Sequence, residues 1–199
     1  MKIIAICGLI GSGKDTVADY LCNFHQYKRD SFASTLKDAI SRIFGWDREM
    51  LEGRTKYSRD WREQVDQWWS TRLNIPNLTP RWVLQNWGTE VCRQGFHDDI
   101  WIASLENRLR NTKDNVVITD CRFANEVKSL RSLGATILRI KRGDDPEWFE
   151  TAQKSIELMK IQYPNVHSSE YAWAQTNFDY VIDNNGTIDE LYQKLKNLA

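Results

Sequence analysis

The chain has 199 residues, 41% hydrophobic and 27% charged, which is enough to bury a core in one domain, with room for an inserted subdomain. Lys plus Arg and Asp plus Glu balance at 27 each, so no global field favours nucleic acid or an anionic membrane. Cys7, Cys22, Cys92 and Cys121 lie far apart without zinc-ligand spacing, and the N-terminal apolar run is too short to span a membrane, so we expect a protein of a reducing cytoplasm.

The stretch GLIGSGKDT at residues 8–16 predicts a phosphate-binding loop. It follows a short apolar run that indicates a buried strand, and it precedes Val17, Leu21 and Phe24, which repeat with helical spacing. Strand, glycine turn and helix form the setting that such a loop requires, because successive N–H groups and the helix dipole then point at an anion. Lys14 adds a mobile charge for the β- and γ-phosphates of a nucleotide. The alternative is a glycine-rich turn without function, which the spacing, the lysine and the flanking elements disfavour.

The position after the lysine departs from the usual loop. Asp15 stands where a hydroxyl that binds magnesium is expected, and Thr16 follows one residue later. A carboxylate next to the phosphates can still hold Mg²⁺, directly or through water. We therefore expect Asp15 and Thr16 to contribute to a metal site.

A second strand is expected over residues 27–33, followed by a helix that Ser34-Thr35 can cap. Lys37 then falls in the first turn of that helix, just past the carboxyl end of the strand, where ligands bind in open α/β sheets. A lysine gains nothing from the dipole at a helix N-terminus. Lys37 is therefore either a clamp on a substrate phosphate or a solvated surface residue.

Residues 34–111 as a whole are predicted to be a helical insertion between two strands of the sheet. The charged and aromatic segment 46–78 has the spacing of one helix with a buried face, Thr79-Pro80 opens another helix, and a further one follows Asp98-Asp99. The residues expected to face inward are Leu36, Ile40, Ile43, Phe44, Trp61, Val65, Trp68, Trp69, Val83, Leu84, Trp87, Val91, Trp101, Ile102, Leu105 and Leu109.

The next expected strand covers residues 116–120 and is apolar until Asp120. In a chain with a phosphate loop, an acidic residue at the end of a buried strand is where the aspartate that organises magnesium belongs. Arg122 follows two residues later at the mouth of the sheet. The alternative for this pair is a structural salt bridge between Asp120 and Arg122.

The remainder of the chain is expected to complete the sheet and to supply a lid. A helix is predicted to end before Gly134, and a strand over 135–141 then delivers Arg139 and Arg142 into a loop. Residues 143–177 indicate a mostly helical excursion, with one helix from Asp145-Pro146 to about Gln162 and a break at Pro164. A last strand at 178–183 and a helix opened by Thr187-x-x-Glu190 follow.

Five strand candidates separated by helices predict an α/β fold with a doubly wound parallel sheet. The predicted division of this single domain is a core of residues 1–33, 112–142 and 178–199, a helical insertion at 34–111 and a lid at 143–177.

Several blocks of sequence carry a resemblance to a known family. They are GLIGSGKDT at 8–16, Leu36-Lys37-Asp38, RWVLQNWGTE at 81–90 with Trp101 beyond it, TDCR at 119–122, GATILRIKRG at 134–143, HSSE at 167–170 and DNNGTIDEL at 183–191. In this order, and over almost the whole chain, they resemble the phage deoxynucleoside monophosphate kinases within the P-loop nucleoside monophosphate kinase fold. The resemblance implies phosphoryl transfer from ATP to a deoxynucleoside 5′-monophosphate, by a homodimer in the cytoplasm of an infected bacterial cell. Residues 46–78 lie outside it.

The resemblance also implies a role for each matching residue. ATP would be bound by Gly11, Ser12, Gly13, Lys14, Asp15, Thr16, Arg139, Asn185 and Gly186. The deoxynucleotide would be bound by Lys37, Arg81, Gln85, Trp101, Arg122 and Glu170. The residues expected to act on the transferred group are Lys14, Asp120, Arg122 and Arg142, and those expected to hold Mg²⁺, in part through water, are Asp15, Thr16 and Asp120.

No general base stands out, and this chemistry needs none, because the attacking phosphate oxygen is already ionised at neutral pH. Other classes remain open. One is a related P-loop kinase acting on phosphomevalonate, dephospho-coenzyme A or a similar small molecule. A nucleotide-dependent switch is weakened by the absence of an NKxD motif, and a nucleic-acid-binding protein using residues 54–62 is disfavoured by the zero net charge.

Overall fold

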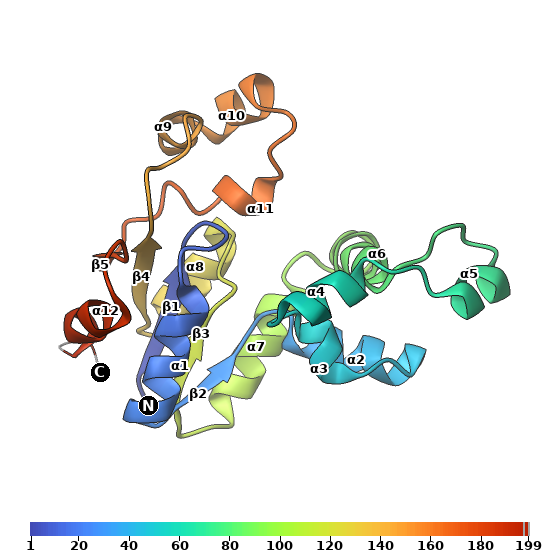
Figure 1. Ribbon diagram of the computed structural model, residues 1–199, viewed down its shortest axis with the longest axis horizontal. Helices are drawn as coiled ribbons and strands as arrows, with labels where there is room; N and C mark the ends of the chain where they lie inside the picture. The colour runs from blue at the N-terminus through green and yellow to red at the C-terminus, as the bar shows by residue number, and fades with distance from the viewer. Residues whose placement is uncertain (197, 199) are drawn as a thin grey trace. The chain divides into compact units, whose positions relative to one another are not determined.

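Five parallel strands form the centre of the fold (Figure 1). The strands are β1 (Ile3–Cys7), β2 (Tyr27–Asp30), β3 (Asn115–Ile118), β4 (Thr136–Lys141) and β5 (Tyr180–Asp183), in the spatial order β2-β3-β1-β4-β5. All four neighbouring pairs are parallel, and β1 in the middle is buried along its whole length. The predicted five-stranded, doubly wound parallel sheet is confirmed.

The computed structural model describes residues 1–196 and 198, and the chain divides into two compact units. The first unit comprises Met1–Ser31 and Leu109–Ala199, and the second comprises Phe32–Arg108. The sheet and the segment predicted as a lid belong to the first unit. The predicted helical insertion at 34–111 overlaps the second.

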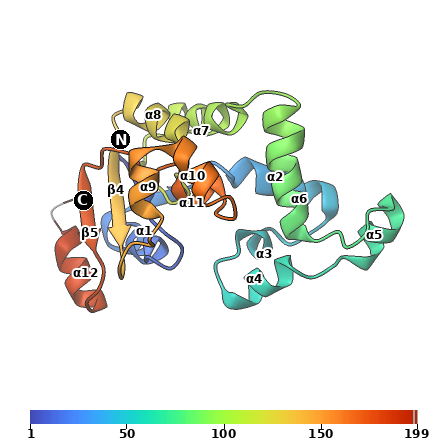
Figure 2. The ribbon, with the colours of Figure 1, turned by 90° about the horizontal axis from the view of Figure 1, so that it is seen from above.

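Helices cover both faces of the sheet in the first unit. Helix α1 (Lys14–His25) contacts β2, β3 and α12 (Ile188–Leu195), whereas α8 (Ala124–Ser132) packs on β1 and β4 from the opposite face (Figure 2). The predicted capping box at the start of α12 is present. The core between α1, α12 and the sheet consists of Ile4, Ile6, Val17, Ala18, Tyr20, Leu21, Tyr27, Val117, Leu138, Ile140, Ile182, Leu191 and Leu195.

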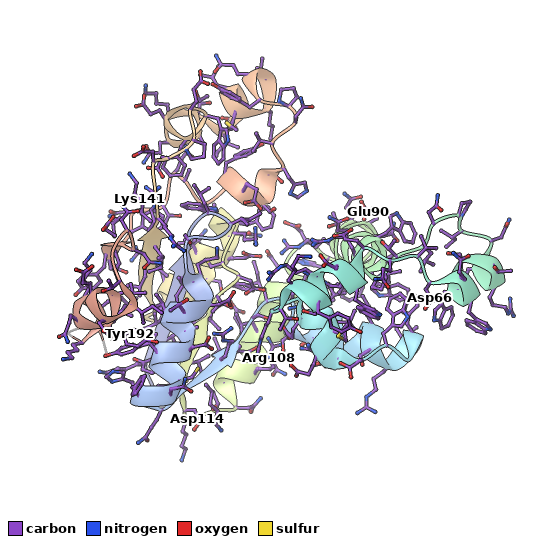
Figure 3. The ribbon with its side chains drawn as sticks, in the orientation of Figure 1. Asp66, Glu90, Arg108, Asp114, Lys141 and Tyr192 are labelled. Atoms are coloured by element: carbon purple, nitrogen blue, oxygen red, sulfur yellow. The ribbon has the colours of Figure 1, made fainter. Side chains whose placement is uncertain are left out.

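Two sequence expectations in the first unit are wrong. Phe24 is 65% exposed although its spacing places it on one face with the buried Val17 and Leu21. It lies at the edge of an aromatic group with Tyr20 and with Tyr192, which Figure 3 labels and whose ring centroid is 4.5 Å from that of Tyr20. The single helix expected up to Gln162 is divided into α9 (Phe149–Lys154) and α10 (Ile156–Gln162). The division falls at Ser155, which has an extended backbone and caps α10 by accepting from the N–H of Leu158. Helix α11 (Ser168–Tyr171) then completes this segment.

The second unit is entirely helical among its described elements. It contains α2 (Ser34–Phe44), α3 (Arg48–Glu52), α4 (Lys56–Arg62), α5 (Gln67–Leu73), α6 (Pro80–Asn86), the π-helix η1 (Trp87–Gln94) and most of α7 (Ile100–Arg110). The prediction of one helix over 46–78 is wrong, because Asp47, Thr55 and Asp66 each cap a new short helix with their side chains. Ala33 rather than Ser34 is the N-cap of α2.

An aromatic cluster holds the second unit together. The ring of Phe44 lies 4.5 Å from that of Trp46 and 4.8 Å from that of Trp69, and the indole N–H of Trp46 donates to Asp66 at 2.8 Å. Three residues expected to face inward are exposed instead, namely Ile43, Trp68 and Val91. Val91 lies in η1, where i→i+5 bonding widens the turn, so residues spaced for an α-helix no longer share one face.

No helix in the described part of the chain has both the length and the apolar character needed to cross a membrane.

Candidate active site

The glycine loop runs from β1 into α1 exactly where its residues predict, and two of its glycines are required by packing. A Cβ on Gly8 would lie 2.6 Å from the carbonyl oxygen of Ile140, and a Cβ on Gly13 would overlap the side-chain amide of Asn184. Both glycines also have positive φ, +150° and +99°. Other residues would strain the loop at these positions, because backbone and neighbours approach too closely.

Lys14 is folded over the loop from which it projects. Its Nζ donates to the carbonyl oxygen of Gly8 at 2.9 Å and to that of Leu9 at 2.8 Å. Burial and the neighbouring guanidinium of Arg122 lower the pKa of Lys14. The structure therefore brings together two cations that the sequence predicted for the two sides of one reaction.

Arg122 has an ionic partner in the segment predicted as a lid. Its Nη1 donates to Oε1 of Glu170 at 2.9 Å and lies 3.5 Å from the carbonyl oxygen of Ser169. The side chains of Arg122 and Glu170 are 36% and 23% exposed, so the pair is accessible from solvent. Glu170 thus joins α11 to the loop that follows β3, and it contributes the local counter-charge for the two cations.

The backbone that carries Arg122 is held by a buried carboxylate that the sequence analysis missed. Glu126 is 2% exposed, and its Oε2 accepts from the N–H groups of Arg122 at 2.8 Å and Phe123 at 3.1 Å. This is the glutamate half of a capping box, in which the carboxylate of Glu126 accepts from the N–H of the N-cap Phe123, whose own side chain makes no capping bond. A glutamate three residues after the start of a helix is the signal that would have identified it.

Asp120 lies two residues beyond the last residue of β3, at the carboxyl edge of the sheet. Because β3 is the neighbour of β1, that edge is also where the glycine loop begins. Asp120 therefore lies near the edge where an aspartate that organises magnesium was expected, although β3 ends two residues before the predicted end of the strand, and its role stays a prediction.

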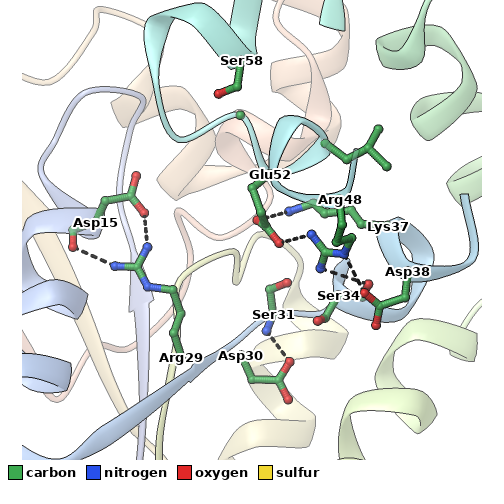
Figure 4. A network of polar contacts seen from close by, with 12 residues as sticks. Asp15, Arg29, Asp30, Ser31, Ser34, Lys37, Asp38, Arg48, Glu52 and Ser58 are labelled. Atoms are coloured by element: carbon green, nitrogen blue, oxygen red, sulfur yellow. Dashed lines mark hydrogen bonds and ion pairs between the residues drawn. The ribbon is translucent and has the colours of Figure 1, made fainter. Parts of the chain in front are cut away.

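Asp15 has a different partner from the one its position suggested. The guanidinium of Arg29, on β2, donates to Oδ1 and to the backbone carbonyl oxygen of Asp15, each at 2.9 Å (Figure 4). The same guanidinium donates to Asp19 at 2.9 Å. Arg29 was not singled out by the sequence, since nothing in its local pattern connects it to the loop.

Arg139, predicted to bind ATP, is placed as a structural residue. Its side chain is 9% exposed and pairs with Asp145, and its guanidinium carbon lies 4.2 Å from the ring centre of Phe149 and 5.6 Å from that of Trp173. These contacts attach the helices after β4 to the sheet. Direct contact of Arg139 with ATP does not fit this burial, whereas Arg142 nearby is exposed.

The loop after β5 touches the glycine loop through Asn184. Its Nδ2 donates to the carbonyl oxygen of Ser12 at 2.8 Å. The adjacent Asn185, predicted to bind ATP, accepts from the N–H of Gly143 at 2.6 Å. Asn184 is therefore the residue of this loop that the sequence analysis missed, and Gly186 remains exposed.

In the second unit, Lys37 belongs to a network of charges (Figure 4). Its Nζ donates to Oε2 of Glu52 at 2.7 Å, and Arg48 binds both Glu52 and Asp38. Burial alone would raise the pKa of Glu52, but Lys37 and Arg48 outweigh it and lower that pKa to about 2. Lys37 is thus neither the free clamp nor the solvated lysine that the sequence left open, because its side chain is only 14% exposed.

The other predicted acceptor residues are dispersed over the second unit. Arg81 pairs with Glu63 at 2.6 Å, Gln85 is exposed on α6, and Trp101 is 9% exposed with its indole N–H donating to the carbonyl oxygen of Gly88 at 2.9 Å. Trp101 is therefore mainly a core residue. Arg62 lies close enough to Arg81 that the two cations interact, and its buried Nε has no hydrogen-bond partner in the described part of the chain.

The oxygen donors near the loop fit magnesium rather than a softer metal. The described residues contain no group of three or more His, Cys, Asp or Glu side chains arranged to hold a metal ion. Mg²⁺ needs no such group where substrate phosphates supply most of the oxygens and one or two protein oxygens complete the shell. Thr16 in the first turn of α1 and Asp120 at the sheet edge are oxygen donors of this kind.

A parallel sheet in this order, with a glycine loop, its lysine and an aspartate at the end of the neighbouring strand, defines a phosphate-loop nucleotide-binding protein. The family model for deoxynucleotide monophosphate kinase matches residues 55–195. A putative deoxynucleotide monophosphate kinase of Acanthamoeba polyphaga mimivirus is 30% identical, with 98% of this chain and 94% of the relative covered. The deoxynucleotide monophosphate kinase of Enterobacteria phage T4 is 22% identical, with 99% and 98% covered. Among solved structures, a shikimate kinase from Aquifex aeolicus aligns with a TM-score of 0.46 and 12% identity over 98% of this chain and 93% of that one. The chain belongs to the deoxynucleotide monophosphate kinase family.

Proposed function

We propose that this protein transfers the γ-phosphoryl group of ATP to a deoxynucleoside 5′-monophosphate, giving ADP and the deoxynucleoside diphosphate. Membership of the family supports the reaction, and the observation that carries the proposal is the placement of Lys14 and Arg122 just beyond the carboxyl ends of the neighbouring strands β1 and β3. One cation projects from the glycine loop, where a donor triphosphate binds, and the other follows the neighbouring strand. Two cations placed in this way offset the repulsion between a polyanionic donor and a dianionic acceptor.

The residues around the loop act by binding and orientation. Lys14 exchanges the carbonyl oxygens of Gly8 and Leu9 for the phosphate oxygens of ATP, and the N–H groups of the loop and of the first turn of α1 bind the same phosphates. Arg122 exchanges Glu170 for the acceptor phosphate, which a guanidinium can bind with two parallel hydrogen bonds. The attacking oxygen carries its charge already, so no residue has to remove a proton.

Magnesium is part of the proposal. Thr16 and Asp120 would hold it, together with ATP, and the ion would neutralise charge on the β- and γ-phosphates. The second carboxylate predicted for this role, Asp15, is bound by Arg29. On the donor side, Arg142 is exposed and therefore available to the transferred group, which supports its predicted role. Arg139 is buried, and this burial does not support the ATP contact predicted for it.

For the acceptor, the proposal uses cations of the second unit. Lys37 and Arg81 stay the predicted contacts of the deoxynucleotide, for which Lys37 would have to leave Glu52 and Arg81 would have to leave Glu63. Arg62 adds a third positive charge in a half-buried position. We further propose a homodimer acting in the cytoplasm of an infected bacterial cell. The phage origin of a relative supports the host in this proposal, and the dimer and the compartment rest on the sequence resemblance alone.

The decisive experiment is a coupled assay of ADP formation with MgATP and each of the four deoxynucleoside monophosphates. We expect turnover with at least one of them and none with dephospho-coenzyme A or phosphomevalonate. Turnover with either of these two and with no deoxynucleotide would replace the proposed function by that of a related small-molecule kinase.

A further inference from the structure

Asp15, the unusual aspartate of the glycine loop, is bound by an arginine that also binds Asp19, and we call this three-residue arrangement the clasp. A single guanidinium, that of Arg29 on β2, makes three hydrogen bonds of 2.9 Å to the beginning of α1. Two reach the carboxylate and the carbonyl oxygen of Asp15, and the third reaches the carboxylate of Asp19 one turn later (Figure 4 shows the first two). Arg29 is 14% exposed, so its side chain has few alternative positions, whereas the two carboxylates are 71% and 64% exposed.

The clasp lies directly beside the donor site. Asp15 stands between Lys14 and Thr16, the residues that face the triphosphate and the metal in the proposed function. An unrestrained carboxylate here would repel the triphosphate or would compete with it for Mg²⁺. With its carboxylate bound by Arg29, Asp15 already has a cationic partner, while its charge still raises the pKa of Lys14.

We propose that Arg29 is a positioning residue of the donor site, which keeps the Asp15 carboxylate out of magnesium coordination. This inference rests on the proposed function for the identity of the donor. It assigns to Asp15 a role opposite to the one its place after the lysine suggests, and it makes Thr16 and Asp120 the oxygen donors for the metal.

The test compares Arg29→Met, Asp15→Asn and the double variant by calorimetric titration with ADP, with and without Mg²⁺. We expect Arg29→Met to weaken binding of MgADP about five- to tenfold, the size of effect typical for one partly exposed charged contact. In the double variant the released carboxylate is absent, so the affinity should return to within about twofold of the wild type. A residue that merely stabilised the fold would give no such rescue.

Asp15→Asn alone separates the two roles of the carboxylate. If the Asp15 carboxylate does not coordinate the metal, Asp15→Asn should leave the Mg²⁺ concentration needed for half-maximal ADP binding unchanged. Asp120→Asn should raise that concentration. A matched control is Lys28→Met, because Lys28 lies beside Arg29 on β2 and pairs with Asp114 at 2.7 Å, away from the loop. That variant should bind MgADP as the wild type does.

Two results would overturn the proposal. One is a double variant that binds as weakly as Arg29→Met, and the other is an Asp15→Asn variant that needs more Mg²⁺. Thermal melting of each variant identifies a loss of folding, in which case Arg29→Lys, which keeps the charge but not the three-way geometry, takes the place of Arg29→Met. Because ADP binding needs no acceptor, the clasp is tested even if no deoxynucleotide is phosphorylated.

Discussion

Arg122 is the residue on which the acceptor side of the proposed reaction depends most directly. Arg122→Ala should raise the KM for the deoxynucleotide at least tenfold, because a bidentate bond to its phosphate is lost, while the KM for ATP changes less. Arg122→Lys should recover little of this loss, since an ammonium cannot reproduce the planar fork. Steady-state kinetics with each substrate varied in turn measures both constants, and an increase confined to ATP would place Arg122 on the donor side.

At the scale of residues, the sequence predicts positions better than partners. The glycines, Lys14 and Asp120 all lie where the motif and the strand pattern put them. The partners of Asp15 and Arg122 could not be predicted, because Arg29 and Glu170 lie 14 and 48 residues away and reach the site only through the fold. The burial of Arg139 was missed for the same reason, since the spacing of residues within a strand does not tell which side a neighbouring helix covers.

The contact between α2 and α3 makes a prediction about acid stability. The pKa of Glu52 is about 2 in the folded protein and about 4.5 in the unfolded chain, so its ion pairs with Lys37 and Arg48 stabilise the fold fully above pH 4.5. As the pH falls from about 4.5 towards 2, the unfolded state binds a proton that the folded state does not, and stability is lost. Glu52→Gln should flatten this part of the profile.

Urea unfolding at a series of pH values from 6 down to about 2.5 measures this effect, which cannot exceed about 1.4 kcal/mol per pH unit for one group. Glu49→Gln is the matched control, because Glu49 lies on the same helix and is exposed. A Glu52→Gln profile parallel to that of the wild type would show that the network contributes nothing to acid stability.

The helices after β4 depend on a cation for their attachment. Arg139→Met should lower the free energy of unfolding by about 2 kcal/mol, because it removes a buried pair with Asp145 and two ring contacts, with Phe149 and Trp173. Arg142→Met, at the exposed end of the same segment, should leave stability unchanged and reduce turnover. Denaturant unfolding and the kinase assay should be applied to both variants. A loss of stability in Arg142→Met together with a loss of turnover alone in Arg139→Met would contradict these assignments.

At the scale of elements, the α/β alternation was predictable and the short helices were not. Apolar runs identify β1, β3 and β4, since burial on both faces leaves a continuous hydrophobic signal. The edge strands β2 and β5 are only partly buried, and β2 consists of one tyrosine and three charged residues. In segment 46–78 the helical spacing of apolar residues continues across the points where one helix ends and the next begins. Trp61, Trp68 and Trp69 therefore suggested a single helix. The caps at Thr55 and Asp66 divide it, and only the aromatic cluster around Phe44 determines which of the tryptophans are covered.

The whole molecule should report donor binding through its stability. A ligand that binds only the folded state at 100 times its Kd adds about 2.7 kcal/mol, which for a chain of this size corresponds to roughly 5–10 °C in Tm. We therefore expect MgADP to raise the Tm of the wild type by that amount. Lys14→Ala should lose most of the increase, because removal of a charged contact to the phosphates weakens binding about a hundredfold and leaves the site only half saturated.

The ligand-free Tm of the Lys14→Ala variant separates binding from folding. In the absence of a nucleotide, the only partners of Lys14 Nζ among the described residues are the carbonyl oxygens of Gly8 and Leu9. Both of these residues have access to water, so the loss of Nζ should change the Tm little. If the variant melts like the wild type without nucleotide yet shows the full increase with MgADP, Lys14 does not bind the donor phosphates. A large drop without nucleotide would instead make Lys14 a structural residue of the loop, and the donor site would have to be sought elsewhere.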